Sequence, residues 1–273
     1  MYQRGYRGKT SLVVLDLAGT LCDGSQDLRR RWPEDDMLGC KAPVLPFYAL
    51  FQRHGITLEW PVIRQFMGMY KPDHLRLLLE LPEVREQYLR LYGHPYTRGE
   101  YLAWLEEFRV LLAQFALDDD LARPVDGAGQ CLAELRQADI LVGYDTGYFN
   151  GIANALVQKL ADQHGLFLDV GSNSDVAHGR PSPGMIYDCM MKAKVWPSEA
   201  VVKVDDTAAG ILSGNNAGCW TVGIYASGSH TYDKLQTARP DFLLPSIKYL
   251  PALIFSSIDP RIRAGGRPGH GFL

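Results

Sequence analysis

Short apolar segments alternate with longer amphipathic segments over most of this chain. The short segments are rich in β-branched side chains, which is typical of strands that are buried on both faces. The predicted strands are residues 11–15, 140–144, 200–204 and 219–224. Apolar positions recur at helical spacing in residues 127–138, 149–164, 183–192 and 207–217. Strands that alternate with helices of this length predict βαβ units, a parallel sheet and hence an α/β, Rossmann-like core.

The pattern changes in the middle of the chain. Helical spacing continues in residues 45–54, 59–67, 73–79 and 98–116, and no convincing strand interrupts it. Polar stretches at 23–36 and 118–124 flank this block and are suitable linkers. We therefore predict an all-helical domain, residues 37–119, inserted into a core formed by residues 1–36 and 120–255. The remainder, residues 256–273, is rich in Gly, Pro and Arg, so we expect it to be poorly ordered.

The composition and net charge indicate which kind of partner the protein binds. The chain has 273 residues, of which 47% are hydrophobic and 22% charged, so it can bury a sizeable core. A length above about 250 residues favours two lobes over one. The net charge of −3 offers no broad basic field, which argues against nucleic acid or an anionic membrane as the main partner. A small-molecule substrate is the better expectation.

The cysteines and the first residues indicate the compartment. An odd count of five, with no CxxC pair, argues against both a disulfide framework and a zinc ribbon, and favours a reducing, cytoplasmic environment. The apolar run after residue 10 ends at Asp16, before a signal-peptide core could form, and no apolar stretch reaches transmembrane length.

Carboxylates follow two of the predicted strands. Asp16 begins the stretch DLAGT after the first strand, and Asp205 and Asp206 follow another. Because ligands of an open parallel sheet bind at the carboxyl ends of its strands, these carboxylates can converge and share a divalent cation. Mg²⁺ needs only a few protein oxygens beside a phosphoryl group. Taken alone, Asp16 could equally cap a turn.

Two further segments favour the chemical interpretation. Residues 145–148, DTGY, follow a predicted strand and offer the Thr146 hydroxyl and the Gly147 N–H to a phosphoryl oxygen, although Thr146 could also simply cap a helix. Arg180 precedes another helix, and a guanidinium suits bidentate contact with a phosphonate or phosphate.

The order of these four motifs resembles the haloacid dehalogenase superfamily and, more narrowly, its phosphonoacetaldehyde hydrolase (phosphonatase) family. Three details carry the narrower resemblance: Ala18 where phosphatases of the superfamily have a second Asp, Arg180 where they usually have Lys, and the stretch MGMYKPDH at 67–74, similar to the family's lysine-bearing cap motif. The resemblance implies a helical cap on the core, Mg²⁺ as cofactor, a homodimer formed through the cap, and hydrolysis of the C–P bond of phosphonoacetaldehyde.

Ala18 and Lys71 have linked chemical meanings. Alanine cannot act as the general acid that protonates an alkoxide leaving group. If Lys71 condenses with an aldehyde, the iminium accepts the electrons of the broken bond and the carbon leaves as an enamine. Apolar neighbours would lower the pKa of this lysine, although most lysines are solvated surface charges. His74 shares the helical face of Lys71 if the helix already runs there, and could move protons, or it could be a core or surface histidine.

The resemblance also assigns roles to the matching residues. Asp16 attacks phosphorus, Lys71 forms the Schiff base, and His74 and Tyr148 are further catalytic positions. Mg²⁺ is held by Asp16, the Ala18 carbonyl and Asp206. The expected substrate contacts are Thr146, Gly147, Arg180, Met67, Gly68 and Cys40, of which Cys40 and Met67 could equally be packing residues.

Two departures from the family remain. The family has an acid four positions after its metal-binding Asp, where this chain has Gly210, so we expect Asp205 to supply that charge as a further metal-site residue. About a dozen extra residues, within 24–39, could alter access at the cap hinge. The alternatives are a phosphate-monoester phosphatase, against which Ala18 weighs, and a catalytically silent phosphate-binding protein.

Overall fold

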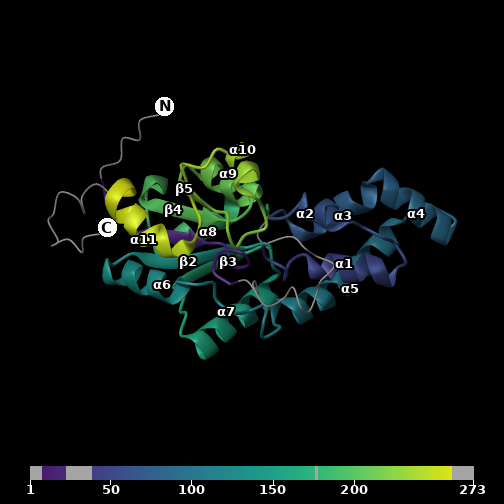
Figure 1. Ribbon diagram of the computed structural model, residues 1–273, viewed down its shortest axis with the longest axis horizontal. Coiled ribbons are helices and arrows are strands. Elements are labelled where there is room, and N and C mark those ends of the chain that lie inside the picture. Colours follow the sequence, from purple (N-terminus) through teal and green to yellow (C-terminus); the bar gives the residue numbers. More distant parts are fainter. Residues whose placement is uncertain (1–7, 23–38, 176–177, 260–273) are drawn as a thin grey trace.

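The computed structural model describes residues 8–22, 39–175 and 178–259. These residues form an elongated molecule with a sheet-containing lobe and a purely helical lobe (Figure 1). The helical lobe comprises α1 (Leu45–Arg53), α2 (Trp60–Arg64), α3 (Lys71–Glu80), α4 (Pro82–Tyr92) and α5 (Arg98–Ala116). All five helices follow the first strand, in the segment where the inserted cap was predicted.

The other lobe is a parallel six-stranded sheet in the order β3-β2-β1-β4-β5-β6. The strands are β1 (Leu12–Leu15), β2 (Leu141–Thr146), β3 (Val170–Asn173), β4 (Val201–Asp205), β5 (Trp220–Ile224) and β6 (Phe242–Leu244). The core helices are α6 (Ala128–Gln137), α7 (Asn150–His164), α8 (Gly184–Ala193), α9 (Ala208–Ala217), α10 (Tyr232–Thr237) and α11 (Leu250–Leu253). Shorter helical turns are Ser198–Ala200, Ile247–Tyr249 and Ile254–Ile258. The predicted α/β fold is confirmed.

Helices cover both faces of the sheet, and the side chains of β1 alternate between them. Val13 and Leu15 belong to the apolar cluster that includes residues of α6 and α11. Leu12 and Val14 pack instead into the cluster that includes α8. Successive side chains of a strand point to opposite faces, so a central strand between two helical layers is apolar throughout. This is why residues 11–15 form an unbroken apolar run.

Five elements were not predicted from the sequence: β3, β6, α4, and the short helices α10 and α11, which have only six and four residues. Strands β3 and β6 are the two edge strands, and they are only partly buried. Helix α4 buries only Val84 and Tyr88, so it lacks a strong apolar stripe. Weak burial leaves little hydrophobic periodicity in the sequence, which explains why β3, β6 and α4 were missed.

Residues 256–273 were expected to be poorly ordered, and the first few of them are not. Residues up to Ile258 continue a helical turn, Ile258 is buried, and the carboxylate of Asp259 accepts a hydrogen bond from the Thr10 N–H at 2.8 Å. The expectation of poor order was therefore wrong for residues 256–259, because this turn packs against the start of the sheet. Residues 260–273 and the extra segment at 24–38 lie outside the described residues, as does the predicted boundary at 36/37. The boundary at 119/120 remains a prediction.

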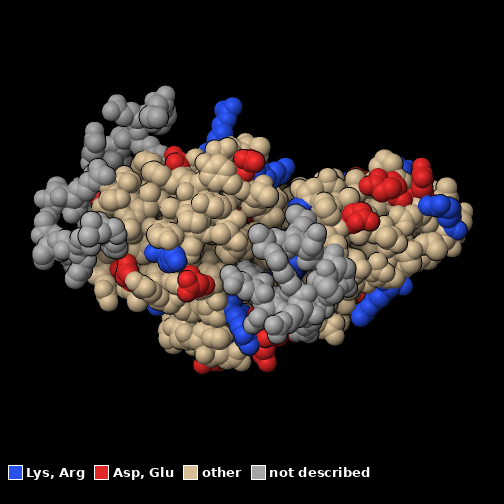
Figure 2. Space-filling view, in the orientation of Figure 1, with Lys and Arg blue, Asp and Glu red and all other residues tan. Residues whose placement is uncertain are grey.

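Acidic and basic side chains are interspersed on the face shown in Figure 2, and neither sign dominates it. All five cysteines are buried and no disulfide joins them. Within the described residues, no helix combines the length and the apolar character that crossing a bilayer requires.

Candidate active site

The candidate active site lies at the carboxyl ends of the three central strands. Leu15 of β1 is paired with Tyr144 of β2 and Val204 of β4, so the next residues of the three strands lie side by side. These residues are Asp16, Asp145 and Asp205, and all three are buried. One oxygen from each lies within 4.8 Å of the others. The sheet thus brings together carboxylates that are far apart in the sequence, as the crevice rule for parallel sheets predicts.

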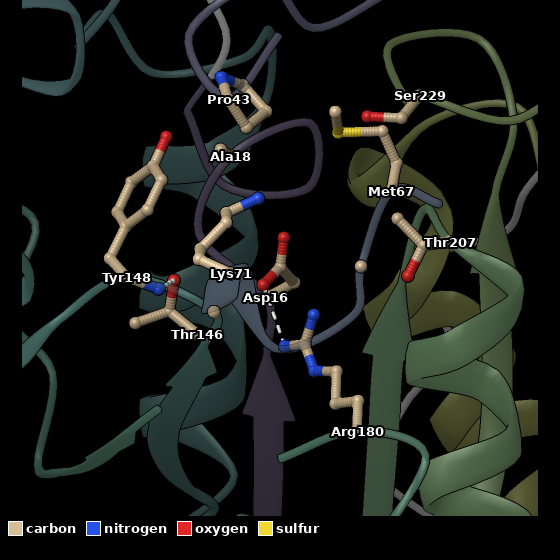
Figure 3. Close-up of a pocket in the computed structure, with 12 residues that line it drawn as sticks. Asp16, Ala18, Pro43, Met67, Lys71, Thr146, Tyr148, Arg180, Thr207 and Ser229 are labelled. Carbon is tan, nitrogen blue, oxygen red and sulfur yellow. Dashed lines mark hydrogen bonds and ion pairs between the residues drawn. The ribbon is translucent and has the colours of Figure 1, made fainter. Parts of the chain in front are cut away.

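A pocket opens above these strand ends, and residues from both the core and the cap line it (Figure 3). The space between its walls, including the part that is open to solvent, is about 320 Å³. Nine of the predicted site residues line it: Asp16, Ala18, Met67, Gly68, Lys71, Thr146, Gly147, Tyr148 and Arg180. Pro43, Thr207 and Ser229 also line it and were not predicted. His74, Cys40, Asp205 and Asp206 are not among the lining residues.

Asp16 is the carboxylate at the base of this pocket. Burial, together with the neighbouring Asp205 and Asp145, raises its pKa to about 6, although Arg180 and Lys203 act in the opposite direction. Its Oδ1 accepts a hydrogen bond from Nη2 of Arg180 at 2.7 Å, the dashed contact in Figure 3. Above pH 6 Asp16 is therefore ionised and poorly solvated, which is the state that a nucleophilic carboxylate needs.

The predicted phosphonate-binding groups surround Asp16. Thr146 ends β2, is buried, and its Oγ1 accepts the Tyr148 N–H at 3.3 Å. Gly147 faces the cap: a side chain there would lie 3.4 Å from the Met69 carbonyl oxygen and 3.7 Å from Cε of Lys71. Together with the Arg180 guanidinium, this arrangement offers a hydroxyl and a cation to the oxygens of a phosphoryl group.

Lys71 reaches the pocket from the cap. It is the first residue of α3 and only 3% exposed, and its side chain extends between Tyr148 and Asp16 in Figure 3. Burial lowers the pKa of Lys71 to about 8, against the opposing attraction of Asp16. The positive end of the helix dipole also disfavours an ammonium there. A lysine with this pKa has a substantial neutral, nucleophilic fraction near neutral pH.

His74 lies one helical turn beyond Lys71. Because α3 already begins at Lys71, the two residues share a face, as the sequence analysis required. The imidazole is fully buried, packs on Phe47 with ring centroids 4.0 Å apart, and donates from Nε2 to the Ile63 carbonyl at 2.9 Å. Burial and the nearby Lys71 hold the pKa of His74 well below its usual value. Its Nδ1 is therefore an unprotonated acceptor, and no hydrogen bond to it is made by the described residues.

Two other predicted residues lie at the edge of the pocket. The Tyr148 hydroxyl is buried without a hydrogen-bond partner in the described part of the chain, and burial holds its pKa well above the usual value. It remains a neutral donor at physiological pH. Cys40 is buried behind the pocket, where its carbonyl accepts a hydrogen bond from Nη1 of Arg64 at 3.1 Å.

The donor set beside Asp16 fits Mg²⁺. Asp206 is fully buried, and burial with the adjacent charges of Asp16 and Asp205 raises its pKa well above the usual value. Its oxygens accept hydrogen bonds from Thr20 Oγ1 at 3.2 Å and from the Ser229 N–H at 2.6 Å, but no basic side chain is among these partners. Carboxylates that lack a compensating cation and offer only oxygen are suited to a hard divalent ion.

Asp16, Asp145 and Asp205 could also hold a metal by their spacing alone. These three carboxylates, however, already face one guanidinium. Arg180 Nη2 lies 2.7 Å from Asp16 Oδ1 and 2.5 Å from Asp145 Oδ1, and its Nη1 lies 3.2 Å from Asp205 Oδ2. Asp206 differs from these three carboxylates, because its hydrogen-bond partners Thr20 and Ser229 carry no positive charge.

The structure also accounts for the glycine at position 210. A Cβ atom at Gly210 would lie 2.0 Å from Cγ of Asp205, so the Asp205 carboxyl fills the space that a side chain at 210 would need. An acidic residue at position 205 or at position 210 would therefore place its carboxyl group in the same space. Burial raises the pKa of Asp205, but Arg180 and Lys203 outweigh that effect and the pKa lies below its usual value. The expectation that Asp205 compensates for the acid missing at 210 stays a prediction.

Comparisons with known proteins place the chain in a family. The model of the haloacid dehalogenase-like hydrolases matches residues 10–218. Phosphonoacetaldehyde hydrolase from Bacillus cereus strain AH187 is 33% identical over 222 residues, covering 81% of this chain and 78% of that protein. The protein of that name from Bacillus mycoides is 32% identical over 222 residues, with the same coverage.

Solved structures agree on the fold. A phosphonoacetaldehyde hydrolase-like protein from Oleispira antarctica superposes with a TM-score of 0.82 at 24% identity, covering 98% of this chain and all of the other. A β-phosphoglucomutase from Clostridium difficile gives a TM-score of 0.66 at 15% identity, covering 94% of this chain and 100% of that one. The chain belongs to the haloacid dehalogenase-like hydrolases. Within them, it is a relative of the phosphonoacetaldehyde hydrolases.

Proposed function

We propose that this hydrolase cleaves the C–P bond of phosphonoacetaldehyde to acetaldehyde and phosphate. The observation that carries the proposal is the placement of Lys71, a buried lysine with a lowered pKa, in the same pocket as Asp16, while position 18 is an alanine. A nucleophile that lacks a general acid needs another route for the electrons of the broken bond. An amine that condenses with an aldehyde provides this route.

The steps follow from the positions of the side chains. Thr146, Gly147 and Arg180 bind the phosphonate, and the neutral Lys71 amine adds to the aldehyde and loses water to form an iminium. An Asp16 oxygen attacks phosphorus, the C–P bond breaks, and its electron pair passes into the iminium to give an enamine on Lys71. Protonation of the enamine carbon and hydrolysis of the resulting imine release acetaldehyde. Water then hydrolyses the aspartyl phosphate.

The remaining residues assist these steps. Nδ1 of His74 is an unprotonated acceptor one turn from Lys71, and it accepts and returns protons as the imine forms and breaks. Mg²⁺, held by Asp16, Asp206 and the Ala18 carbonyl, would offset the negative charge that Asp16 and the phosphonate bring together. Cap residues Met67 and Gly68 close the pocket over the substrate and exclude water.

A small substrate panel tests this proposal. Purified protein with Mg²⁺ is incubated with phosphonoacetaldehyde, with 2-aminoethylphosphonate, which lacks the carbonyl, and with phosphate monoesters, and released phosphate and acetaldehyde are measured. We expect both products from phosphonoacetaldehyde alone. Faster phosphate release from the monoesters would identify a phosphatase instead, and binding of phosphate without turnover of any compound would identify a silent binding protein.

We also propose a homodimer through the cap, as the resemblance implies. Exposed apolar side chains on the cap helices include Leu89 and Leu91 of α4 and Leu102 and Val110 of α5. Light scattering coupled to size-exclusion chromatography measures the mass directly. A monomer at micromolar concentration would reject this part of the proposal.

A further inference from the structure

Arg180 is surrounded by carboxylates. Its Nη2 donates a hydrogen bond to Asp16 Oδ1. The same nitrogen also donates to two oxygens of Asp145, the side-chain Oδ1 at 2.5 Å and the main-chain carbonyl oxygen at 2.8 Å. On its other side Nη1 faces Asp205 Oδ2 at 3.2 Å. One guanidinium therefore faces carboxylates from three adjacent strands. The N–H groups of a planar guanidinium can donate hydrogen bonds to several acceptors at fixed angles, which an ammonium group cannot do.

A buried lysine completes this arrangement. Lys203 lies in the middle of β4 and is fully buried, although its neighbours Val202 and Val204 are apolar. Its Nζ bonds to Asp145 Oδ1 and lies 2.8 Å from Asp205 Oδ2. Lys203 and Arg180 thus share the same two carboxylates, and they contact the same oxygen of each, Asp145 Oδ1 and Asp205 Oδ2.

This sharing affects the pair formed by Arg180 and Asp16. A guanidinium paired with a single carboxylate tends to form two parallel hydrogen bonds with it. Such a pair would occupy both oxygens of Asp16 and turn the guanidinium away from a phosphonate. Here Asp145 and Asp205 attract Arg180 to the strand ends, and Lys203 holds both of those carboxylates through its contacts with Asp145 Oδ1 and Asp205 Oδ2.

We propose that Lys203 and Asp145 are positioning residues that hold Arg180 in the orientation needed to bind the phosphoryl group. The proposal rests on the proposed function in taking Arg180 as the phosphoryl-binding cation. Neither residue contacts the pocket: they act through Arg180. The alternative is that they only neutralise each other as a buried ion pair, which would affect stability alone.

A charge-balanced double variant separates these two roles. Lys203→Met alone leaves buried carboxylates without their partner and is expected to lower the stability. The combination of Lys203→Met with Asp145→Asn removes one positive and one negative charge, so the stability should recover and the net charge of the site is unchanged. Its matched control is Lys192→Met with Asp188→Asn, the same change at an exposed pair on α8 with a separation of 2.6 Å.

The measurement is the binding of inorganic phosphate by calorimetry in the presence of Mg²⁺, with Tm recorded for each protein. We expect the Kd for phosphate to rise about 10-fold in the Lys203/Asp145 double variant and to be unchanged in the control. In the Arg180→Lys variant the guanidinium is already absent. Adding Lys203→Met and Asp145→Asn to that variant should therefore change the Kd for phosphate by less than about 2-fold.

Two results would overturn the inference. One is a double variant whose Tm recovers and whose phosphate affinity equals that of the wild type, because the pair would then be only structural. The other is a weakening of equal size in the Arg180 and Arg180→Lys backgrounds, because the effect would then not pass through Arg180. Because phosphate binding requires no C–P cleavage, failure of the proposed substrate leaves this test intact.

Discussion

Lys71 lies in an environment that disfavours its charged form. Burial lowers its pKa from the usual 10.5 to about 8, so at neutral pH the folded protein holds an ammonium that would be better solvated in the unfolded chain. A shift of this size corresponds to a destabilisation on the order of 3 kcal/mol. Retaining such a group is expected of a functional residue and not of a structural one.

Lys71→Met should therefore abolish C–P cleavage and raise the stability at pH 7. The methionine fills a similar volume without an ammonium to desolvate. The sign of the pH effect follows from the lowered pKa. The advantage of the variant is full below pH 8, and it declines as the pH rises from 8 towards 10.5, because the wild-type lysine is then neutral in the folded protein.

Thermal unfolding at pH 7 and pH 10 measures this difference. For the active wild type, kcat/KM should rise as the pH increases towards 8, since both ionised Asp16 and neutral Lys71 accumulate in that range. A Lys71→Met variant that is less stable than the wild type at pH 7 would contradict the burial argument.

The two adjacent aspartates at the end of β4 have different partners, and this predicts different effects on the metal. Asp206→Asn should weaken Mg²⁺ binding more than Asp205→Asn, by about 10-fold or more, because Asp205 is already held by Arg180, Lys203 and Thr207. Calorimetric titration with Mg²⁺ gives the affinities without relying on turnover. EDTA should stop the reaction and Mg²⁺ restore it, and full activity in EDTA would reject the metal site.

At the scale of elements, the sequence predicted those helices and strands that bury a regular apolar face or have a clear cap. Helix α5 has the ends that the helical spacing of its apolar residues predicted, 98 and 116, and a capping box formed by Thr97 and Glu100 stabilises its start. Helix α3 begins at Lys71 and not at residue 73, since Pro72 is tolerated in the first turn. That small difference matters, because it places Lys71 and His74 on one face.

Gly68, in the cap loop before α3, lies against the core, and its position gives an element-scale prediction. Gly68 has a φ of +84°, and a Cβ atom there would lie 2.2 Å from Oγ1 of Thr207. Gly68→Ala should therefore hold the cap away from the core and lower kcat/KM by about 100-fold, as expected when a reacting group is displaced.

Gly93 provides the matched control. Its φ is +77°, so alanine suffers similar backbone strain, but a Cβ atom there would have nothing within 4 Å. Gly93→Ala should lose a comparable amount of stability and keep its activity. Equal kcat/KM in the Gly68→Ala and Gly93→Ala proteins would show that contact between Gly68 and Thr207 does not control closure.

At the scale of the whole molecule, the pocket exists only where cap and core meet. The sequence predicted its motif residues because they follow strands or match a family pattern. It did not predict the contact between Lys203 and Asp145, which are 58 residues apart on strands separated by β1. A lysine between valines in a buried strand was the available signal, but its partner depends on strand order. Pro43 and Ser229 likewise enter the pocket through loops whose paths only the tertiary structure defines.

The central claim is that Lys71 from the cap forms a covalent bond to the substrate held by the core. The most direct test is treatment of the protein with phosphonoacetaldehyde, Mg²⁺ and borohydride, followed by peptide mass spectrometry. An imine is reduced to a stable amine, whereas an ion pair is not, so we predict an added two-carbon group on Lys71 and none on Lys41 or Lys203. Absence of the Lys71 adduct, together with normal turnover by Lys71→Arg, whose guanidinium forms no imine, would contradict the account.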